Sequence, residues 1–184
     1  DMNVIKSMCL VVAGLGLAGQ VGGQVSEVGP VRVVEEQRVV ELAICLDTSG
    51  SMSGLINATK QKLWAIVNEL ALAEPAPKLR VALLTYGNNG HPQENGWVRI
   101  DSGLTDDLDL ISQKLFALTT NGGTEYVGRV LNYAEQLDWH PSNDALKLIV
   151  VAGNEGADQD QQVPFQGVCR TLIGRGIMIN SIYC

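Results

Sequence analysis

Residues 42–54 read LAICLDTSGSMSG, an unbroken apolar run of five residues followed at once by a polar loop. A continuous apolar run of this length is typical of a parallel strand that is covered on both faces. The loop that follows carries Asp47, Ser49 and Ser51 at alternate positions. The stretch therefore predicts a central strand whose carboxyl end presents oxygen-bearing side chains.

The rest of the chain alternates between apolar strands and one-sided helices. The pattern predicts further strands at residues 81–85, 97–100, 146–152 and 177–183, and helices at 55–74, 106–118, 124–137 and 161–173. This alternation indicates an α/β fold, a doubly wound, mostly parallel sheet with helices on both faces, and residues 97–100 are expected at a sheet edge. Right-handed crossovers place the strand-to-helix loops at one edge, where ligands bind in such Rossmann-like folds. Because the chain stops directly after its last predicted strand, we expect a domain truncated at its C-terminus.

Composition excludes several classes of function. The chain has 184 residues, the length of about one domain. Its formal net charge is −7 and its 13 basic residues are scattered, which argues against a nucleic-acid partner. The four cysteines form no CxxC pair, so a zinc ribbon is not expected. The two histidines, His91 and His140, leave little for histidine chemistry and are expected to be ordinary surface residues.

Residues 1–23 have the pattern of a secretory signal peptide. Lys6 precedes an apolar run at residues 8–17, and small residues follow it. The run is about half of the ~20 residues that a membrane span needs, so no span is expected in the mature chain. A buried N-terminal helix is the alternative, but the glycines disfavour it. We therefore expect export to the periplasm, cell surface or extracellular space, a linker at residues 24–37 and a folded domain at residues 38–184.

Three loops at the ligand-binding edge are rich in oxygen-bearing side chains: residues 47–54, 121–125 and 153–158. A carboxylate with several hydroxyls suits a hard cation such as Mg²⁺, which prefers oxygen ligands and keeps several waters. Because hydroxyls are neutral, the ion would still accept an anionic ligand from outside. The same residue types also cap helices and form turns without any metal, so one such loop alone would carry little weight.

The sequence Asp47-x-Ser49-x-Ser51 after an apolar strand, with Gly-Gly-Thr ending at Thr124, resembles the metal-ion-dependent adhesion site of von Willebrand factor type A domains. The resemblance extends over residues 39–184. It implies that Ser49 and Ser51 ligate the ion through their hydroxyls. It also implies that Thr124 binds directly or through water, and that Asp47 holds coordinating waters or the ion itself. The implied ion is Mg²⁺, or else Mn²⁺ or Ca²⁺, and the implied partner is a protein that offers an Asp or Glu carboxylate to the metal.

The third loop departs from the family's pattern. The family usually has an Asp in a Thr-Asp-Gly or Ser-Asp-Gly turn, whereas this chain has Gly153-Asn154-Glu155. We expect Asn154 at the Asp position, with Glu155 as its acidic neighbour. Gly-Asn-Glu here, and the ending Ile-Asn-Ser-Ile-Tyr-Cys, resemble bacterial exported members of the family. Because Asn lacks the charge, either Glu155 restores it or the ion binds more weakly.

The predicted function is therefore divalent-cation-dependent protein binding and not catalysis. A structural interaction module with a vestigial metal site is the alternative. A third hypothesis is a serine hydrolase with Ser49 as its nucleophile. No Gly-x-Ser-x-Gly elbow surrounds this residue, and no activating base is identifiable. Cys169 and Cys184 either form a disulfide or remain as two buried thiols, because spacing alone does not fix their geometry.

Overall fold

The computed structural model describes residues 37–184, so the predicted signal peptide and all but the last residue of the predicted linker lie outside the described residues. The described chain contains a five-stranded sheet in the order β3-β2-β1-β4-β5. The strands are β1 (Val39–Asp47), β2 (Lys78–Tyr86), β3 (Arg99–Thr105), β4 (Leu146–Gly153) and β5 (Ile177–Tyr183). All pairs are parallel except β2 with β3, which is antiparallel.

The central position of β1 confirms the prediction from the apolar run. It pairs with β2 on one side and with β4 on the other. Every residue of β1 after Val39 is buried, because helices cover both faces of the sheet. Leu42, Ile44 and Leu46 belong to the core on one face, and Ala43 and Cys45 belong to the core on the other.

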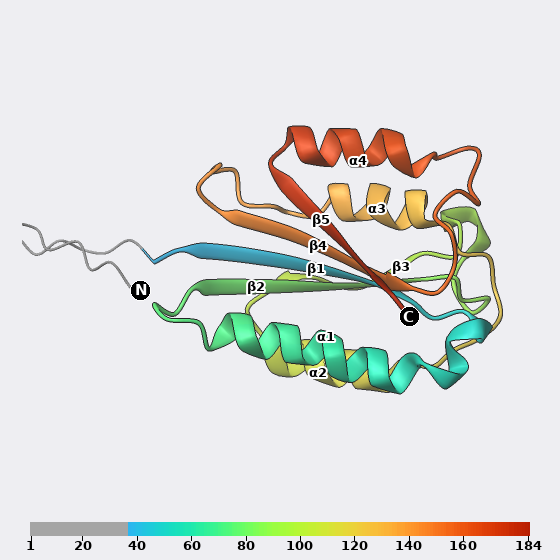
Figure 1. Ribbon diagram of the computed structural model, residues 1–184, viewed down its shortest axis with the longest axis horizontal. Helices are drawn as coiled ribbons and strands as arrows, with labels where there is room; N and C mark the ends of the chain where they lie inside the picture. The colour runs from blue at the N-terminus through green and yellow to red at the C-terminus, as the bar shows by residue number, and fades with distance from the viewer. Residues whose placement is uncertain (1–36) are drawn as a thin grey trace, which may run out of the picture. The chain divides into compact units, whose positions relative to one another are not determined.

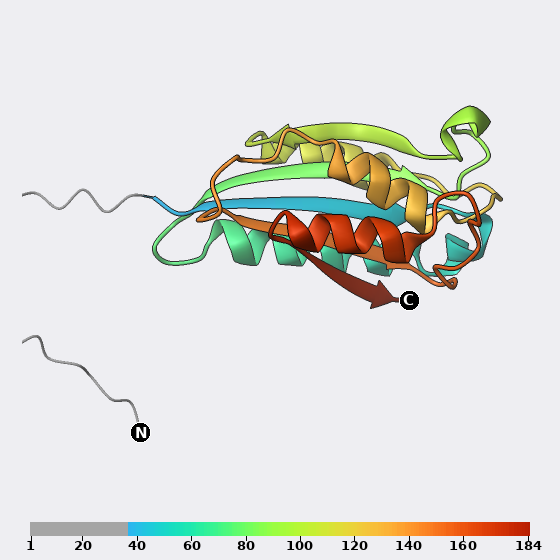
Figure 2. The same ribbon diagram turned by 90° about the horizontal axis from the view of Figure 1, so that it is seen from above.

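Two pairs of helices flank the sheet. Helices α1 (Ile56–Ala71) and α2 (Leu108–Ala117) lie on one face, and α3 (Val127–Glu135) and α4 (Phe165–Gly174) lie on the other (Figure 1). Figure 2 shows these layers from above. The predicted doubly wound α/β fold is thus confirmed. Within residues 37–184, no helix is long and apolar enough to cross a bilayer.

Several predicted boundaries differ from the structure: β2 begins earlier, at Lys78, β3 continues to Thr105, and α1 ends at Ala71. Three starting points shift because of loop structure. The edge strand was expected at residues 97–100 but begins at Arg99, because Gly96 and Trp97 both adopt left-handed backbone conformations, with φ of 68° and 55°. Helix α4 begins at Phe165 and not at residue 161, because the Asp160 carboxylate accepts the backbone N–H groups of Gln162 and Val163 and holds this segment as a loop. Helix α3 begins at Val127 and not at residue 124, because residues 121–126 form a loop without regular secondary structure.

The cysteine alternatives resolve into unpaired thiols. Cys169 lies on α4 and packs against the core on that face of the sheet, whereas Cys184 packs against the core on the opposite face. Cys184 Sγ lies 3.3 Å from Thr59 Oγ1 on α1. Among the described residues Cys45, Cys169 and Cys184 are all free.

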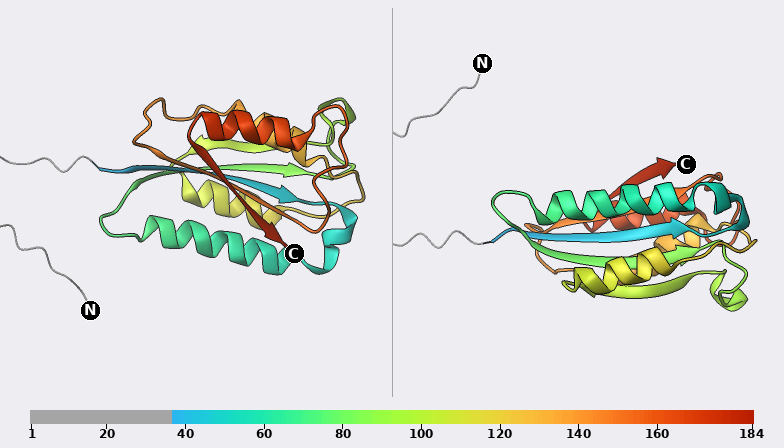
Figure 3. Two further views of the ribbon diagram at one scale, coloured as in Figure 1. Left: turned by 45° about the horizontal axis from the view of Figure 1, so that its top comes forward. Right: turned by 90° about the horizontal axis from the view of Figure 1, so that it is seen from below.

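The carboxyl ends of β1, β2 and β4 lie at one edge of the sheet, together with the loops that follow them (Figure 3). The first of these loops includes the short 3-10 helix η1 (Gly50–Gly54), and the second includes η2 (Gln93–Asn95). From β1 the next strands, β2 and β3, are added on one side, whereas β4 and β5 are added on the other side. The strand order therefore reverses between β1 and β4. This is the place where ligands bind in open α/β sheets.

Candidate metal centre

Asp47 ends β1 at the switch point and is fully buried. Its Oδ1 accepts the backbone N–H of Ser49 at 2.8 Å, whereas Oδ2 has no hydrogen-bond partner in the described chain. Burial raises the pKa of Asp47 and nearby Glu125 raises it further, against the opposing effects of hydrogen bonding by Ser49 and of the nearby Asn154 backbone. A buried carboxylate oxygen without a partner is costly, and a bound cation would remove that cost.

A chain of hydroxyls links the first loop to the third. Ser49 Oγ lies 2.9 Å from Ser51 Oγ, and Ser51 Oγ donates to Asn154 Oδ1 at 3.1 Å. Each hydroxyl has one proton, so Ser49 donates to Ser51, which donates to Asn154. All three oxygens keep lone pairs that a cation can use. The structure therefore brings together Asp47, Ser49, Ser51 and Asn154.

Glycines let neighbouring loops approach Asp47. Gly87, directly after β2, has φ of 73°, and a Cβ there would lie 2.9 Å from Asp47 Oδ1. A Cβ at Gly153 would lie 2.6 Å from the hydroxyl oxygen of Tyr86 and 3.1 Å from Asp47 Cβ. Side chains at these two positions would therefore push the loops away from the carboxylate.

The second predicted loop packs beside the first. The backbone N–H of Asn121 donates to the carbonyl of Thr48 at 3.0 Å, and a Cβ at Gly123 would lie 2.1 Å from the Gly87 carbonyl oxygen. Thr124 follows and is half-buried. Within residues 37–184, its hydroxyl makes no hydrogen bond to either serine. The structure thus packs the loop that leads to Thr124 against Thr48 and Gly87, without joining the Thr124 side chain to the hydroxyl chain.

The two nearby glutamates differ in burial. Glu155 is exposed, and the contact to Ser51 comes from Asn154 instead. Glu125 is 9% exposed, and its Cγ would lie 3.2 Å from a Cβ at Gly87, next to Asp47. Sequence reasoning did not select Glu125 as a site residue, although its position directly after Thr124 was a signal. None of the ion pairs within residues 37–184 includes Asp47 or Glu125.

This donor set fits a hard divalent cation. The described residues contain no cluster of three or more His, Cys, Asp or Glu side chains placed to hold a metal. A site here must therefore depend on hydroxyl and amide oxygens with carboxylates beneath them. Mg²⁺ accepts such a set, because it prefers oxygen ligands and completes its shell with water.

The histidines do not serve Ser49, and one prediction about them is wrong. His91 was expected at the surface but is buried, because the loop after β2 folds back so that His91 Nε2 lies 2.9 Å from Thr85 Oγ1. His140 Nδ1 accepts the backbone N–H of Ser142 at 3.2 Å. Ser49 Oγ, in the described chain, has Ser51 as its neighbour and not a ring nitrogen.

The family model described as von Willebrand factor type A domain matches residues 41–182. The chain therefore belongs to the von Willebrand factor type A family, as the motif around Asp47 predicted. Members of this family commonly mediate metal-dependent protein interactions. No match was found among curated proteins.

Several solved structures share the fold. The SpRpn10 VWA domain aligns with a TM-score of 0.62 and 18% identity, over 79% of this chain and 75% of that one. Proximal thread matrix protein 1 from the mussel byssus, with a zinc-occupied MIDAS motif, aligns with a TM-score of 0.63 and 16% identity, over 80% and 36%. A von Willebrand factor type A protein from Catenulispora acidiphila gives 0.57 and 19%, over 79% and 32%. This chain thus spans about a third of the last two, and the low identities establish the fold alone.

Proposed function

We propose that residues 38–184 form a domain that binds another protein through a divalent cation. Ser49 and Ser51 hold the ion through their hydroxyls, and Thr124 holds it directly or through water. Asp47 supports it from beneath, and Asn154 contributes its side-chain carbonyl from the third loop. The ion is Mg²⁺, with Mn²⁺ or Ca²⁺ as alternatives, and it supplies a positive charge that an Asp or Glu carboxylate of the partner can bind.

The observation that carries this proposal is the unpartnered Oδ2 of Asp47. This fully buried oxygen lies near a second buried carboxylate, Glu125, and neither belongs to an ion pair of the described chain. Two buried acids without a cation are unfavourable, and a divalent ion would offset their repulsion. The hydrogen bond from Ser51 to Asn154 supports Asn154, more than exposed Glu155, as the third-loop ligand.

The hydroxyls also explain how a partner would bind. Ser51 is exposed, so the site is open to solvent on the side where its proposed ligands are neutral hydroxyls. A cation whose outer ligands are neutral retains affinity for an external carboxylate. Residues 87–96 and 154–162 flank this opening in the proposed complex and would select the partner.

A thermal-melt titration of the chain with Mg²⁺, Mn²⁺ and Ca²⁺ tests the metal site. At 100 times the dissociation constant, an ion that binds only the native state stabilises it by ~2.7 kcal/mol, a readily measured rise in melting temperature. Ser49→Ala should abolish the shift. Ser53→Ala is the matched control, because Ser53 lies in the same loop but outside the hydrogen-bonded chain of Ser49, Ser51 and Asn154.

The outcomes are distinct. If the unmodified chain melts cooperatively and no ion shifts its melting temperature, or if Ser49→Ala shifts equally, the proposed site is wrong and the structural-module alternative gains support. If metal binds but partner capture is unchanged by a chelator, the ion is not part of the interface. Labelling of Ser49 by a fluorophosphonate would contradict our proposal that the domain is not an enzyme.

Export is a separate proposal that rests on the sequence of residues 1–23. Expression of the chain with its N-terminus intact, followed by N-terminal sequencing of the product, tests it. Cleavage near residue 23 with recovery outside the cytoplasm is the expected result, and an uncleaved cytoplasmic product would contradict it.

A further inference from the structure

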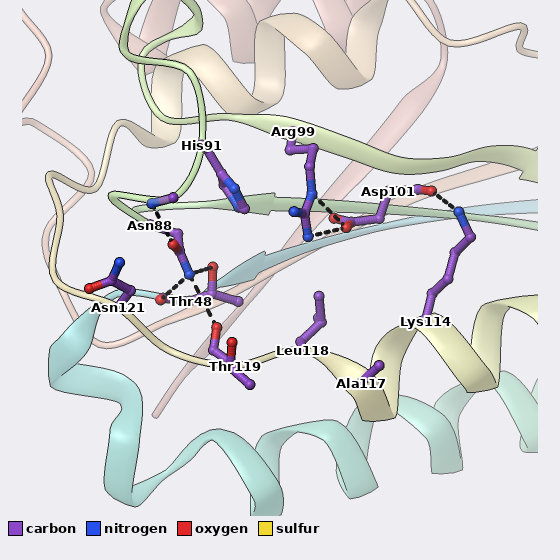
Figure 4. A pocket seen from close by; sticks show the side chains of 11 residues that line it. Thr48, Asn88, His91, Arg99, Asp101, Lys114, Ala117, Leu118, Thr119 and Asn121 are labelled. Atoms are coloured by element: carbon purple, nitrogen blue, oxygen red, sulfur yellow. Dashed lines mark hydrogen bonds and ion pairs between the residues drawn. The ribbon is translucent and has the colours of Figure 1, made fainter.

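Apart from the candidate metal centre, the structure has a recess between β3, the end of α2 and the loop after β2 (Figure 4). Its volume is about 520 Å³. None of the predicted metal ligands lines it. Its walls combine charged and polar side chains with two short apolar ones, Ala117 and Leu118.

Two cationic side chains face this recess from different elements, Arg99 from β3 and Lys114 from α2. Arg99 Nε donates to Asp101 Oδ1 at 2.8 Å, and Nη2 of the same guanidinium pairs with the same oxygen. The third nitrogen, Nη1, makes no bond to these residues, and Figure 4 shows it turned toward His91 and the recess. One edge of the guanidinium therefore remains available to a ligand.

Asp101 does not neutralise both cations. Its Oδ1 takes Arg99, and its Oδ2 accepts the hydroxyl of Thr85 at 2.7 Å, so both carboxylate oxygens are held in place. Lys114 Nζ donates to the backbone carbonyl of Asp101 and not to its carboxylate. Two positive charges thus share one negative charge, within a chain whose formal net charge is −7.

His91 forms a neutral wall beside Arg99. Burial lowers the pKa of His91 and the Arg99 charge lowers it further, against the opposing effects of Asp101 and the Gly90 backbone. Because Thr85 gives its one proton to Asp101, its oxygen accepts the Nε2–H of His91. The ring is therefore fixed by the same network that fixes Asp101, and the wall is preformed.

We propose that this recess is a second binding site, for a small molecule that carries a carboxylate or phosphate group. The free edge of Arg99 would take two oxygens of the group, and the ammonium of Lys114 would supply a further charge. The volume lies within the range of small-molecule pockets, which leaves room for an organic body beside Ala117 and Leu118. The proposal does not depend on the metal site.

Isothermal titration of the chain, freed of divalent ions on a chelating resin and kept in buffer without soluble chelator, tests it, with sodium phosphate, acetate, citrate and chloride at equal ionic strength. Saturable binding of phosphate or of a carboxylate, but not of chloride, is expected, and whichever class binds more tightly, phosphate or carboxylate, identifies the natural ligand class. No saturable binding of any oxyanion at millimolar concentrations would overturn the proposal. Because divalent ions have been removed beforehand, failure of the metal proposal leaves this result unchanged.

Variants separate a shaped site from general attraction. Lys114→Met should weaken binding roughly tenfold, the loss of one charge-assisted hydrogen bond. Lys62→Met is the matched control, because Lys62 is exposed on α1 and should have no effect. Arg99→Lys keeps the charge but removes the fork, and it should also weaken binding about tenfold. Unchanged affinity in either recess variant would overturn the proposal.

A measurement on the unmodified chain covers the case in which Arg99→Lys fails to fold. The side-chain N–H signal of Arg99 in a nitrogen-15 NMR spectrum should move as the oxyanion is added and should stay fixed with chloride. An oxyanion that binds while this signal remains fixed would bind elsewhere, and the recess would be the wrong place.

Discussion

A carboxylate is buried near each end of β1, and the two carboxylates differ in whether they have partners. At the amino end, Glu41 is fully buried, and its Oε1 accepts Arg80 Nη1 at 2.8 Å while its Oε2 accepts the backbone N–H of His140 at 2.7 Å. At the carboxyl end, Asp47 is equally buried but has no cationic partner and one unpartnered oxygen. The difference separates an end that stabilises the fold from an end that is prepared for a ligand.

Breaking the Glu41 pair should have the largest effect. Arg80→Met leaves the Glu41 carboxylate buried without its cation, which typically costs about 3 kcal/mol of the free energy of unfolding. Urea unfolding in EDTA measures it, with Lys62→Met as the control for loss of an exposed charge. A loss below the ~0.5 kcal/mol typical of surface changes would mean that Glu41 is not held as the structure indicates.

Closing the space around Asp47 should come next. Gly87→Ala puts a Cβ at a left-handed position and 2.9 Å from Asp47 Oδ1. The backbone term alone costs about 1–2 kcal/mol. Gly54→Ala is the matched control, because no atom lies within 4 Å of a Cβ there. Urea unfolding should show the loss for Gly87→Ala only, together with a loss of the melting-temperature shift produced by Mg²⁺.

Neutralising Asp47 should act in the opposite direction from breaking the Glu41 pair. Asp47→Asn removes a buried, unpaired charge near Glu125, so the free energy of unfolding in EDTA should stay constant or rise by about 1 kcal/mol. In Mg²⁺ the variant should lose its advantage, because it binds the ion more weakly than the unmodified chain. A fall of several kcal/mol in EDTA would show that Asp47 is a structural residue like Glu41, and the comparison would fail.

The sequence alone was sufficient to predict the carboxyl end of β1 and the loop that follows it. The apolar run and the alternate Asp47, Ser49 and Ser51 are contiguous, so strand position and loop chemistry could be read together. Asn154 followed from the order of the loops. The position of Glu125 after Thr124 was a signal, but the burial of Glu125 and of His91 could not be predicted. That burial depends on tertiary contacts, of Glu125 with Gly87 and of His91 with Thr85.

The strand boundaries show the same limit. The start of β3 depends on two consecutive left-handed residues, and nothing in the local sequence favours that conformation at Trp97. The Trp97 ring packs against Tyr126, with 5.7 Å between the two ring centroids. Tertiary contacts of this kind set boundaries that periodicity alone places only to within a few residues.

Asp160 sharpens the comparison, because it is a buried carboxylate at the ligand-binding edge that is nevertheless paired. Its Oδ2 pairs with Arg129 Nε, and its Oδ1 accepts the backbone N–H groups of Gln162 and Val163. Burial alone would raise the pKa of Asp160, but these bonds together outweigh it and hold the pKa below its usual range. Location at this edge is therefore not what leaves Asp47 unpaired.

The smallest expected effect is the pH dependence of that pairing. Because the folded pKa of Asp160 is lowered, its stabilising contribution is present above the unfolded value of about 3.9 and is lost as the pH falls through the folded pKa. Asp160→Asn should therefore cost about 1 kcal/mol at pH 7, and the gap between the two chains should close as the pH drops below about 4. Urea unfolding across that range measures the gap. A gap that stays constant with pH would mean that the Asp160 charge contributes nothing and that only its backbone contacts matter. Asp160 would then no longer show that pairing, rather than position, distinguishes Asp47 from the other buried acids.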